Sequence, residues 1–420
     1  MRRVILAMLV GLAGTAAADP LDEVGLGAAD AGMGGARMPF AIGADAAHAD
    51  PAAVAIAARP EILVGWQDTA MQLSLDGHDA GATDAHGAAL GVALPFTIAG
   101  LHLGVGAATY LPDQYLARLQ LVPIGEPSFL RFQSQAQRLV VEPTVSLAIG
   151  DWAFGAGASF LSDARSRQVQ FDVGVVGGTK QGNAALDVVL PLRAAPLASV
   201  RWRPARWLTV VGAFRGQLSL DLAFDIRANV NVPGVVTGDA IVSLRSVSYF
   251  TPLRATLGVA VQPREDLVIT GEVSYERWSA LGSGAPDLRV LLGLDIAPPL
   301  VDGTVPPARF HDLVTPRVGA EWQLGRWFAR AGAGYLPSPV PAQTGITSYA
   351  DGARTLATLG GGVRLPAPGA LRWPIDLDLA VAWEHVAAAV VHKDAAIAPG
   401  GDYSSGGDLA QVSVSAKVRF

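Results

Sequence analysis

The last eleven residues of the chain, 410–420, read AQVSVSAKVRF and decide the fold class. Apolar residues occupy every second position from Ala410 to Phe420, and the residues between them are polar. A period of two places the two sets on opposite faces of a β-strand. The same alternation occurs in residues 314–324 and 375–384. Several such strands in series predict an all-β protein.

The N-terminus has the composition of a secretory signal peptide, which we expect to span residues 1–18. Two arginines precede a short apolar core, residues 4–12, and the alanines at 16–18 fit a cleavage site. The apolar core is shorter than the ~20 residues that a membrane-spanning helix needs. We therefore expect an exported protein whose mature chain begins near Asp19.

The composition favours a membrane protein and argues against several function classes. Half of the 420 residues are apolar and only 16% are charged. A net charge of −6 without a basic run argues against a nucleic-acid partner. The absence of Cys removes disulfides and thiolate metal sites. Residues 85–112 lack charged side chains but contain Pro95 and five glycines, which favours two strands joined at Ala99–Gly100 over one helix.

Short turns and tryptophans define one rim of the predicted sheet. The short turns are at 99–100, 150–151, 204–205, 263–266, 325 and 366–372. Six of the nine tryptophans flank them, as in the aromatic girdle of a membrane barrel: Trp152, Trp202, Trp207, Trp322, Trp327 and Trp373. A soluble secreted β-sandwich, the main alternative, would have strands of about 5–6 residues and no reason to place Trp beside its turns.

These features predict a transmembrane antiparallel β-barrel of about 14 strands over residues 61–420. Outer-membrane barrels have short periplasmic turns and longer outer loops, so six short turns separate seven hairpins. The expected strands are 61–75, 86–98, 101–110, 136–149, 151–162, 184–203, 206–230, 238–262, 266–280, 311–324, 326–336, 353–366, 373–388 and 407–420. We assign the strand-like segments 168–176 and 288–296 to outer loops.

The predicted outer loops are partly apolar, which is unusual for segments that face water. Segments 111–135 and 296–310 contain the candidate ligand-binding residues Leu116, Leu119, Leu121, Ile124, Phe129, Phe132, Leu300 and Phe310. An apolar loop indicates either packing within the barrel mouth or a surface that binds an apolar ligand. The sequence leaves both interpretations open.

Residues 19–60 precede the first strand and do not alternate. They are rich in Gly and Ala, too long for a linker and too apolar for a free tail, so we expect a plug, or hatch, inside the lumen. The polar residues expected to face the lumen include Arg201, Arg317, Glu321 and Arg330. They indicate either paired charges in a hydrated lumen or an arginine that recognises a carboxylate.

Two long segments carry a resemblance to a known family. Residues 25–55, GLGAADAGMGGARMPFAIGADAAHADPAAVA, and residues 315–341, TPRVGAEWQLGRWFARAGAGYLPSPVP, resemble the hatch and a hairpin of the FadL-type transporters of long-chain fatty acids and hydrocarbons. Residues 255–279 and the pair Asp351 and Arg354 agree in order with the same family. The resemblance covers 24–60 and 251–366 and implies a 14-stranded barrel with an N-terminal hatch.

The hatch residues that the resemblance singles out are Gly34 and Gly35 and the Asp50-Pro51-Ala52 motif. The family has Asn-Pro-Ala at the latter place, so Asp50 adds a charge. An ionised Asp accepts hydrogen bonds but cannot donate them. We therefore expect a different attachment of the hatch, or a cationic partner for Asp50.

The sequence contains no recognisable catalytic or metal motif. It has no G-x-S-x-G elbow and no phosphate-binding loop, and its seven histidines lack the spacing of a metal site. We therefore expect no enzyme activity, no cofactor and no metal.

The resemblance implies a bacterial outer-membrane channel for the facilitated uptake of long-chain fatty acids or hydrocarbons. Apolar outer loops would capture the solute, and a movement of the hatch would let it pass. The expected partners are outer-membrane lipid, the solute, and the barrel-assembly machinery through the strand that ends in Phe420. A general porin and a structural or surface-interaction barrel are the alternatives.

Overall fold

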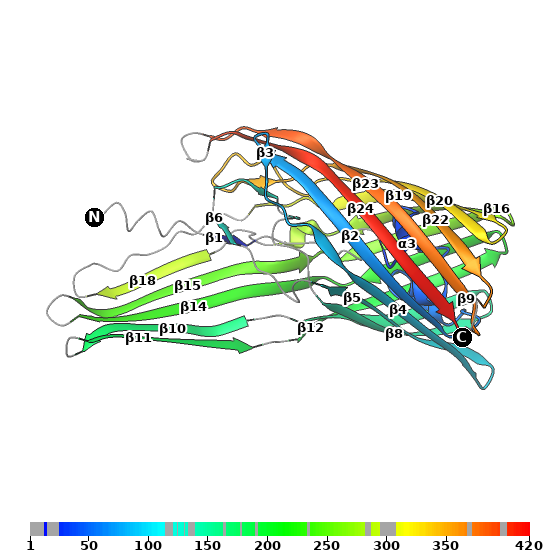
Figure 1. Cartoon of the computed structure of the whole chain (residues 1–420), viewed down its shortest axis with the longest axis horizontal. Coiled ribbons are helices and arrows are strands. Elements are labelled where there is room, and N and C mark those ends of the chain that lie inside the picture. The colour runs from blue at the N-terminus through cyan, green and yellow to red at the C-terminus, as the bar shows by residue number, and fades with distance from the viewer. Residues whose placement is uncertain are drawn as a thin grey trace.

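The computed structural model describes residues 12–14, 25–113, 121–123, 125–129, 131–132, 139–162, 165–176, 179–189, 192–232, 236–281, 287–294, 308–367, 372–394 and 401–420. Its largest sheet is a closed barrel of antiparallel strands (Figure 1). Apart from residues 12–14, the predicted signal peptide lies outside the described residues. Among those residues, no helix has the length and apolar content to cross a membrane.

Fourteen strands form the barrel wall, each hydrogen-bonded to its neighbour in the chain order of the wall. The first and last strands pair from Glu61 opposite Arg419 to Leu75 opposite Ser405, which closes the barrel. The strands are β2 (Glu61–Leu75), β4 (Ala85–Ile98), β5 (Leu101–Pro112), β8 (Val140–Ile149), β9 (Trp152–Ser162), β12 (Leu192–Ala205), β13 (Leu208–Arg215), β16 (Arg254–Arg264), β17 (Leu267–Glu276), β19 (Leu313–Leu324), β20 (Trp327–Leu336), β22 (Arg354–Leu365), β23 (Ile375–Val391) and β24 (Tyr403–Arg419). The predicted number of barrel strands is confirmed.

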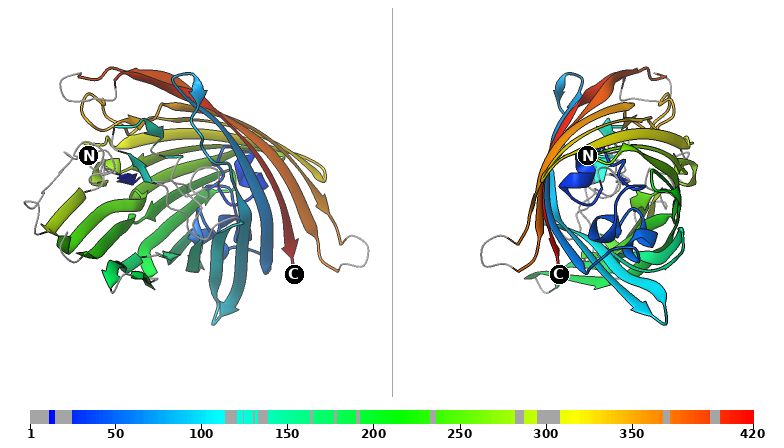
Figure 2. Two further views of the ribbon diagram at one scale, coloured as in Figure 1. Left: turned by 60° about the vertical axis from the view of Figure 1, so that its left-hand side comes forward. Right: turned by 90° about the vertical axis from the view of Figure 1, so that its right-hand side faces the viewer.

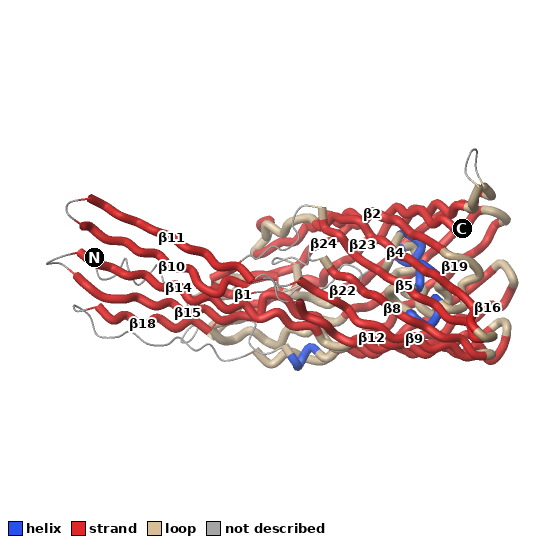
Figure 3. The backbone as a smooth tube through the Cα atoms, turned by 90° about the horizontal axis from the view of Figure 1, so that it is seen from below, coloured by secondary structure: helices blue, strands red, loops and turns tan. Residues whose placement is uncertain are grey.

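A second sheet of five strands projects from one end of the barrel (Figures 1 and 3). Its order is β11 (Thr179–Val189), β10 (Arg165–Val176), β14 (Leu218–Val232), β15 (Val236–Thr251) and β18 (Asp287–Leu294). Strands β10 and β14 pair in parallel, and the other pairs are antiparallel.

This projecting sheet corrects three of the predicted barrel strands. The segments 184–203, 206–230 and 238–262 each divide between the barrel and the projecting sheet. Gly216 and Gln217 separate β13 from β14, and Pro252 and Leu253 separate β15 from β16. Apolar and polar residues keep alternating in the sequence across each break. The period of two therefore does not indicate where the chain leaves the barrel wall. Pro252 has no N–H for a ladder hydrogen bond, which suits it to such a break.

Short elements complete the fold. They are the strand pairs β1 (Leu12–Gly14) with β6 (Leu121–Pro123) and β7 (Ser128–Phe129) with β21 (Tyr349–Ala350), the two-residue strand β3 (His78–Asp79), the helix α3 (Ala28–Ala31), and the 3₁₀ turns η1 (Gly43–Ala46), η2 (Pro51–Val54) and η3 (Trp278–Ala280).

The barrel has an apolar outer surface and a polar interior. In β24, Val412 and Val414 are 48% and 44% exposed, whereas Ser413 between them is 1% exposed. Strand β23 likewise exposes an apolar side chain, Leu379, and buries a charged one, Glu384. A soluble sandwich would bury its apolar face instead. This arrangement is that of a transmembrane barrel, whose outer face contacts lipid.

One rim of the barrel consists of the short turns predicted from the sequence. At the turn between β4 and β5, Ala99 and Gly100 both have positive φ, as a two-residue hairpin turn requires. All six girdle tryptophans are exposed, Trp152 stacks on Trp202 with ring centroids 5.3 Å apart, and Trp322 donates to Asp266 at 3.0 Å. Short turns face the periplasm in outer-membrane barrels, so we call this the short-turn rim and the opposite end the loop rim.

Candidate functional site

Residues 25–60, here called the lumenal segment, lie inside the barrel (Figure 2). Helix α3 contacts β22, β23 and β24 on one side of the wall. The turns η1 and η2 contact β2, β4, β5, β8, β9 and β12 on the other. Most residues from Gly25 to Ala55 are buried, so the segment fills part of the lumen with packed backbone and small side chains.

Glycines on the inner wall let the lumenal segment approach closely. A Cβ atom at Gly332 in β20 would lie 2.2 Å from the carbonyl carbon of Met33 and 2.4 Å from the backbone nitrogen of Gly34. A Cβ atom at Gly155 in β9 would lie 2.2 Å from the backbone nitrogen of Ala52. Both distances are shorter than any real contact, so these wall positions require glycine while the segment is seated.

Asp50 attaches the lumenal segment to the wall through Arg201 of β12. The Arg201 Nε donates to Asp50 Oδ2 at 2.7 Å, and both side chains are buried. The same guanidinium donates to the carbonyl oxygens of Met38, Pro39 and Ala41 at 2.8–3.2 Å. One arginine therefore holds two parts of the segment at once, and the rigid fork of its donors suits this role.

A chain of ion pairs connects the segment to the opposite wall. Arg37 of the segment contacts Asp45 at 2.7 Å, and Lys417 of β24 binds the same carboxylate. On its other side, Arg37 lies 3.8 Å from Glu321, which accepts from Arg330 at 2.6 Å. Each cation thus has an acidic partner, as burial demands.

The charges around the segment shift the pKa of two of its carboxyl groups in opposite directions. Burial alone would raise the pKa of Asp45, but Lys417 and Arg37 outweigh it and hold that pKa below its usual range. Burial raises the pKa of Asp30, although Arg37 and His48 oppose the shift. The Oδ2 atom of Asp30 accepts only a long hydrogen bond from Leu26, at 3.3 Å. Asp45 is therefore a fixed charge, and Asp30 is the carboxyl group that protonates more readily.

His48 attaches the segment to a third part of the wall. Its Nδ1 lies 2.7 Å from Glu142 Oε2 of β8, and Arg215 of β13 donates to Glu142 Oε1 at 2.6 Å. Arg215 also donates to the carbonyl oxygen of His48. The pairing of β8 with β9 has a gap at Glu142 and Pro143, because Pro143 has no N–H to donate. The contact with His48 therefore lies where the wall has fewer ladder hydrogen bonds.

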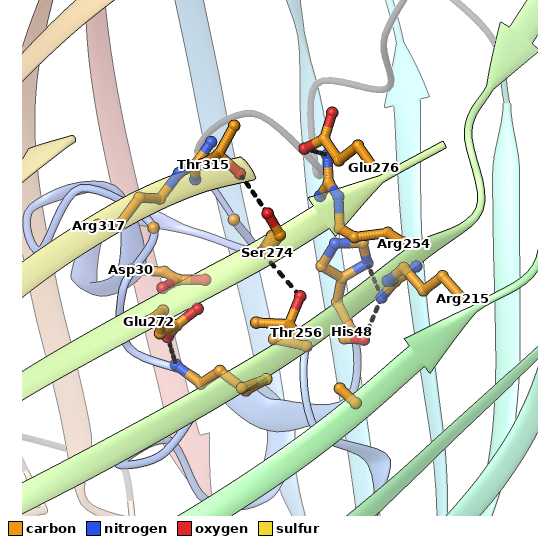
Figure 4. Close-up of a pocket in the computed structure, with 15 residues that line it drawn as sticks. Asp30, His48, Arg215, Arg254, Thr256, Glu272, Ser274, Glu276, Thr315 and Arg317 are labelled. Atoms are coloured by element: carbon orange, nitrogen blue, oxygen red, sulfur yellow. Dashed lines mark hydrogen bonds and ion pairs between the residues drawn. The ribbon is translucent and has the colours of Figure 1, made fainter. Parts of the chain in front are cut away.

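A polar cavity separates the segment from β13, β16, β17 and β19 (Figure 4). Asp30 of the segment and Glu272 of β17 lie next to each other at this cavity, and Arg254 and Arg317 are among the other polar residues that line it. Its volume, about 60 Å³, suffices for a few water molecules and is far below the 300–1,000 Å³ typical of a ligand pocket. The boundary between the lumenal segment and the barrel wall is thus polar where this cavity lies.

Larger pockets lie between the segment and the short-turn rim. Their volumes are about 320, 620 and 480 Å³, and Ile56 lines all three. Phe40 and Ile42 line the first two, and Ile42 and Ile56 are 40% and 39% exposed. The side of the segment that faces the short-turn rim therefore presents apolar surface to space of ligand size.

Apolar and polar residues alternate along the strands of the projecting sheet, and its register pairs apolar residues with apolar ones. Ile226 pairs with Val169 of β10 and with Val242 of β15, which pairs with Val290 of β18. Two residues earlier in β14, Phe224 pairs with Leu244, and Leu244 pairs with Leu288. The residues between them, Asp225, Ser243 and Arg289, are polar and pair with one another. In β14 the same alternation starts with Leu218 and Leu220, which are buried in a cluster with Leu161 and Tyr249.

Solved structures with this architecture extend over nearly the whole chain. A FadL homologue of Pseudomonas aeruginosa aligns with a TM-score of 0.60 at 18% identity, covering 98% of this chain and 100% of that one. The toluene transporters TodX of P. putida and TbuX of Ralstonia pickettii each align at 0.55, with 14% and 16% identity, 95% of this chain covered, and 99% and 100% of theirs. No family model and no curated protein sequence matches. The chain has the FadL-type barrel fold.

Within this FadL-type fold, the lumenal residues singled out from the sequence lie at the contacts between segment and wall. Asp50 and Arg201 form one ion pair, and Glu321 and Arg330 form another. Arg317 donates to the carbonyl oxygen of Gly34 at 3.5 Å, beside Gly35. Pro51 and Ala52 lie against Gly155, and the Ala52 nitrogen donates to Ser199 at 2.9 Å.

The structure describes only some of the outer-loop residues proposed as ligand contacts. Phe129 and Phe132 are buried in a cluster with Leu73 and Tyr403, and Phe310 is buried beside Trp278 and Tyr349. Arg354 lies over the Phe132 ring, 5.3 Å from its centroid, and donates to Glu384. These three aromatic rings therefore pack within the loop rim. Of the others, Leu121 lies in β6, and Leu116, Leu119, Ile124 and Leu300 lie outside the described residues.

Sequence reasoning missed the residues around His48. His48 stood alone in the sequence, and Glu142 and Arg215 lie 94 and 167 positions away from it. Alternation assigns Glu142 to the polar face of its strand, but nothing in a linear sequence pairs it with a residue of the segment. Only the register around the barrel brings the three together.

Proposed function

We propose that the chain is an outer-membrane channel for the facilitated uptake of hydrophobic small molecules, such as long-chain fatty acids or hydrocarbons. The observation that carries this proposal is the seating of the lumenal segment. Its hydrogen bonds and ion pairs reach eight wall strands: β2, β8, β12, β13, β17, β19, β22 and β24. A segment bound around the lumen leaves little room for the open aqueous path of a general porin.

The polar character of this seat supports a role as a movable hatch. Ion pairs, hydrogen bonds and a cavity of about 60 Å³ form much of the contact between segment and wall. Water and solutes can replace polar contacts at small net cost, since a hydrogen bond contributes only about 0.5–1.5 kcal/mol net. Buried apolar contacts lie beside these polar ones, as where Leu26 and Val54 of the segment cluster with Leu63 of the wall.

The apolar residues that alternate along the projecting sheet support capture at the cell surface. In β14 they follow Leu218 and Leu220, which belong to a buried cluster of the barrel. A hydrophobic solute gains roughly 25 cal/mol per Å² of apolar surface removed from water. The proposed route runs from the projecting sheet, past the lumenal segment, to the apolar pockets near the short-turn rim. No energy source is required, because the solute moves down its own gradient.

Two measurements test the proposed function. The first compares the uptake of labelled long-chain fatty acid and alkane by the host with and without the gene; we expect slower uptake without it. The second records single-channel currents of the refolded mature chain; we expect small steady currents. Unchanged uptake in a host without a second copy would refute the channel, and large steady currents would favour the general porin.

A further inference from the structure

The pocket of about 320 Å³ at the short-turn rim has an unusual combination of charge and apolar surface. On the lumenal side it is lined by Phe40, Ile42 and Ile56. On the rim side it is lined by Arg203, Arg206 and Asp151, with Trp152 and Trp207 next to them. Its volume falls within the 300–1,000 Å³ of small-molecule sites, and its lining has an apolar end and an end of net positive charge.

The two rim arginines have no acidic partner among the residues that the structure describes. Arg203 donates only to the carbonyl oxygen of Arg206, at 3.2 Å. By contrast, four of the five arginines that line the 620 Å³ pocket have acidic partners, among them Arg330 with Glu321 and Asp378, and Arg364 with Asp376. An unpaired guanidinium beside apolar surface is ready to bind an anion, because its planar donors fit a carboxylate or phosphate.

The position of the pocket sets the orientation of a ligand. Trp207 is 55% exposed and belongs to the girdle at the membrane interface, so the arginines lie at headgroup level. Ile42 and Ile56 lie inward of them on the lumenal segment and keep 40% and 39% of their surface exposed. A ligand that covers both ends must carry an apolar tail and an anionic head.

We infer that this pocket is a binding site for an anionic amphiphile, with the tail against Phe40, Ile42 and Ile56 and the head on Arg203 and Arg206. The inference rests on the proposed function in one respect only: a transported carboxylate would bind at this site before it leaves the channel. The same chemistry fits an anionic phospholipid of the inner leaflet. In either case the head is recognised by charge, so a neutral molecule of equal chain length binds more weakly.

The test uses the refolded mature chain in nanodiscs of phosphatidylcholine. Laurate brominated on the carbons close to its carboxylate quenches tryptophan fluorescence on contact, and the equally brominated dodecanol is the neutral control. We expect laurate to quench at lower concentration than dodecanol, and the double variant W152F/W207F, which removes both tryptophans of the pocket, to lose the saturable part. The double variant R203Q/R206Q should weaken laurate binding about tenfold or more and leave dodecanol unchanged.

Arg326→Gln is the matched control, because Arg326 is a rim arginine outside this pocket that lies over Trp327. It should bind laurate as the wild type does. Equal affinities for laurate and dodecanol, or no effect of R203Q/R206Q in a protein that still migrates as a folded barrel, would overturn the inference.

Two further measurements complete the test. The first distinguishes a transported carboxylate from a membrane lipid as the ligand, and the second distinguishes failure of this inference from failure of the proposed function. If added phosphatidylglycerol displaces laurate in the wild type, the pocket also accepts membrane lipid; if it does not, the site selects the free carboxylate. Uptake of a neutral alkane, which tests the proposed function, should be the same in R203Q/R206Q and wild type. Arginine-dependent laurate binding without any alkane uptake would uphold the site and refute the channel.

Discussion

At the residue scale, the ion pair of Asp50 with Arg201 explains how this chain tolerates a charge in the Asp-Pro-Ala motif of its lumenal segment. A buried carboxylate without a partner would be unstable, and the guanidinium supplies both the counter-charge and three hydrogen bonds to the segment. The sequence reveals the charge at Asp50 and the inward position of Arg201. It does not reveal that the two meet, because 151 positions separate them.

Substitution of Asp50 by Ala should loosen the lumenal segment. The change leaves Arg201 buried without its counter-ion, which costs about 3–5 kcal/mol when one partner of a buried pair is lost. We expect faster hydrogen exchange across residues 38–55 and larger current fluctuations in bilayers. D50A/R201Q should cost less than the sum of the single variants, and additive effects would show that the pair does not act as a unit.

Mild acid should not release the segment. The pKa of Asp45 is depressed, so its contribution to stability is present at neutral pH and is lost only below its usual range. The pKa of buried Asp30 is raised, so protonation of this group as the pH falls relieves a penalty and favours the seated state. Arg37 and His48 of the segment and Glu272 and Arg317 of the wall surround this group.

Hydrogen exchange, corrected for intrinsic rates, measures this pH effect. Protection of residues 25–37 should stay constant or increase from pH 7 to pH 5. In Asp30→Asn the increase should vanish. A clear loss of protection at pH 5 in the wild type would contradict the account of both carboxyl groups.

At the element scale, glycines in the wall strands decide how closely the lumenal segment can seat. Gly332→Ala would put a Cβ atom 2.2 Å from Met33, so the segment or strand β20 must shift. We expect a loss of about 1–3 kcal/mol in stability and faster exchange near Gly34. Gly271→Ala is the control, because nothing lies within 4 Å of its Cβ position. Equal effects of the two substitutions would mean that the segment is not seated on β20.

The projecting sheet should be dispensable for the barrel but needed for capture. Replacing residues 165–189 by a short turn removes β10 and β11, which pair with β14 and with no barrel strand. We expect the shortened protein to migrate as a heat-modifiable folded barrel and to take up solute more slowly at low concentration. Uptake equal to that of the wild type would show that β10 and β11 take no part in capture.

The period of two predicted most of the wall, because each barrel strand has one lipid face and one lumen face. It gave the right number of strands and the right rim of turns, with tryptophans beside them. The prediction failed where strands outside the barrel wall also alternate. Strands β14 and β15 of the projecting sheet also alternate between apolar and polar residues, so residues 206–230 and 238–262 read as single strands.

At the scale of the whole molecule, three parts follow one another along the barrel. The projecting sheet extends beyond the loop rim, the lumenal segment lies across the lumen, and pockets of 320–620 Å³ lie near the short-turn rim. The proposed function requires the middle part to move. A chain without Cys allows this requirement to be tested with one engineered disulfide.

The measurement that tests the central claim most directly is solute uptake by cells whose chain carries Ala52→Cys and Ser199→Cys. The Ala52 nitrogen lies 2.9 Å from the Ser199 hydroxyl, so a disulfide here ties the lumenal segment to β12. Each single-Cys variant is the control. We predict that oxidation lowers the uptake of labelled long-chain solute to the level of the gene deletion and that a reductant restores it. Undiminished uptake by fully cross-linked protein would contradict the claim that the segment must move.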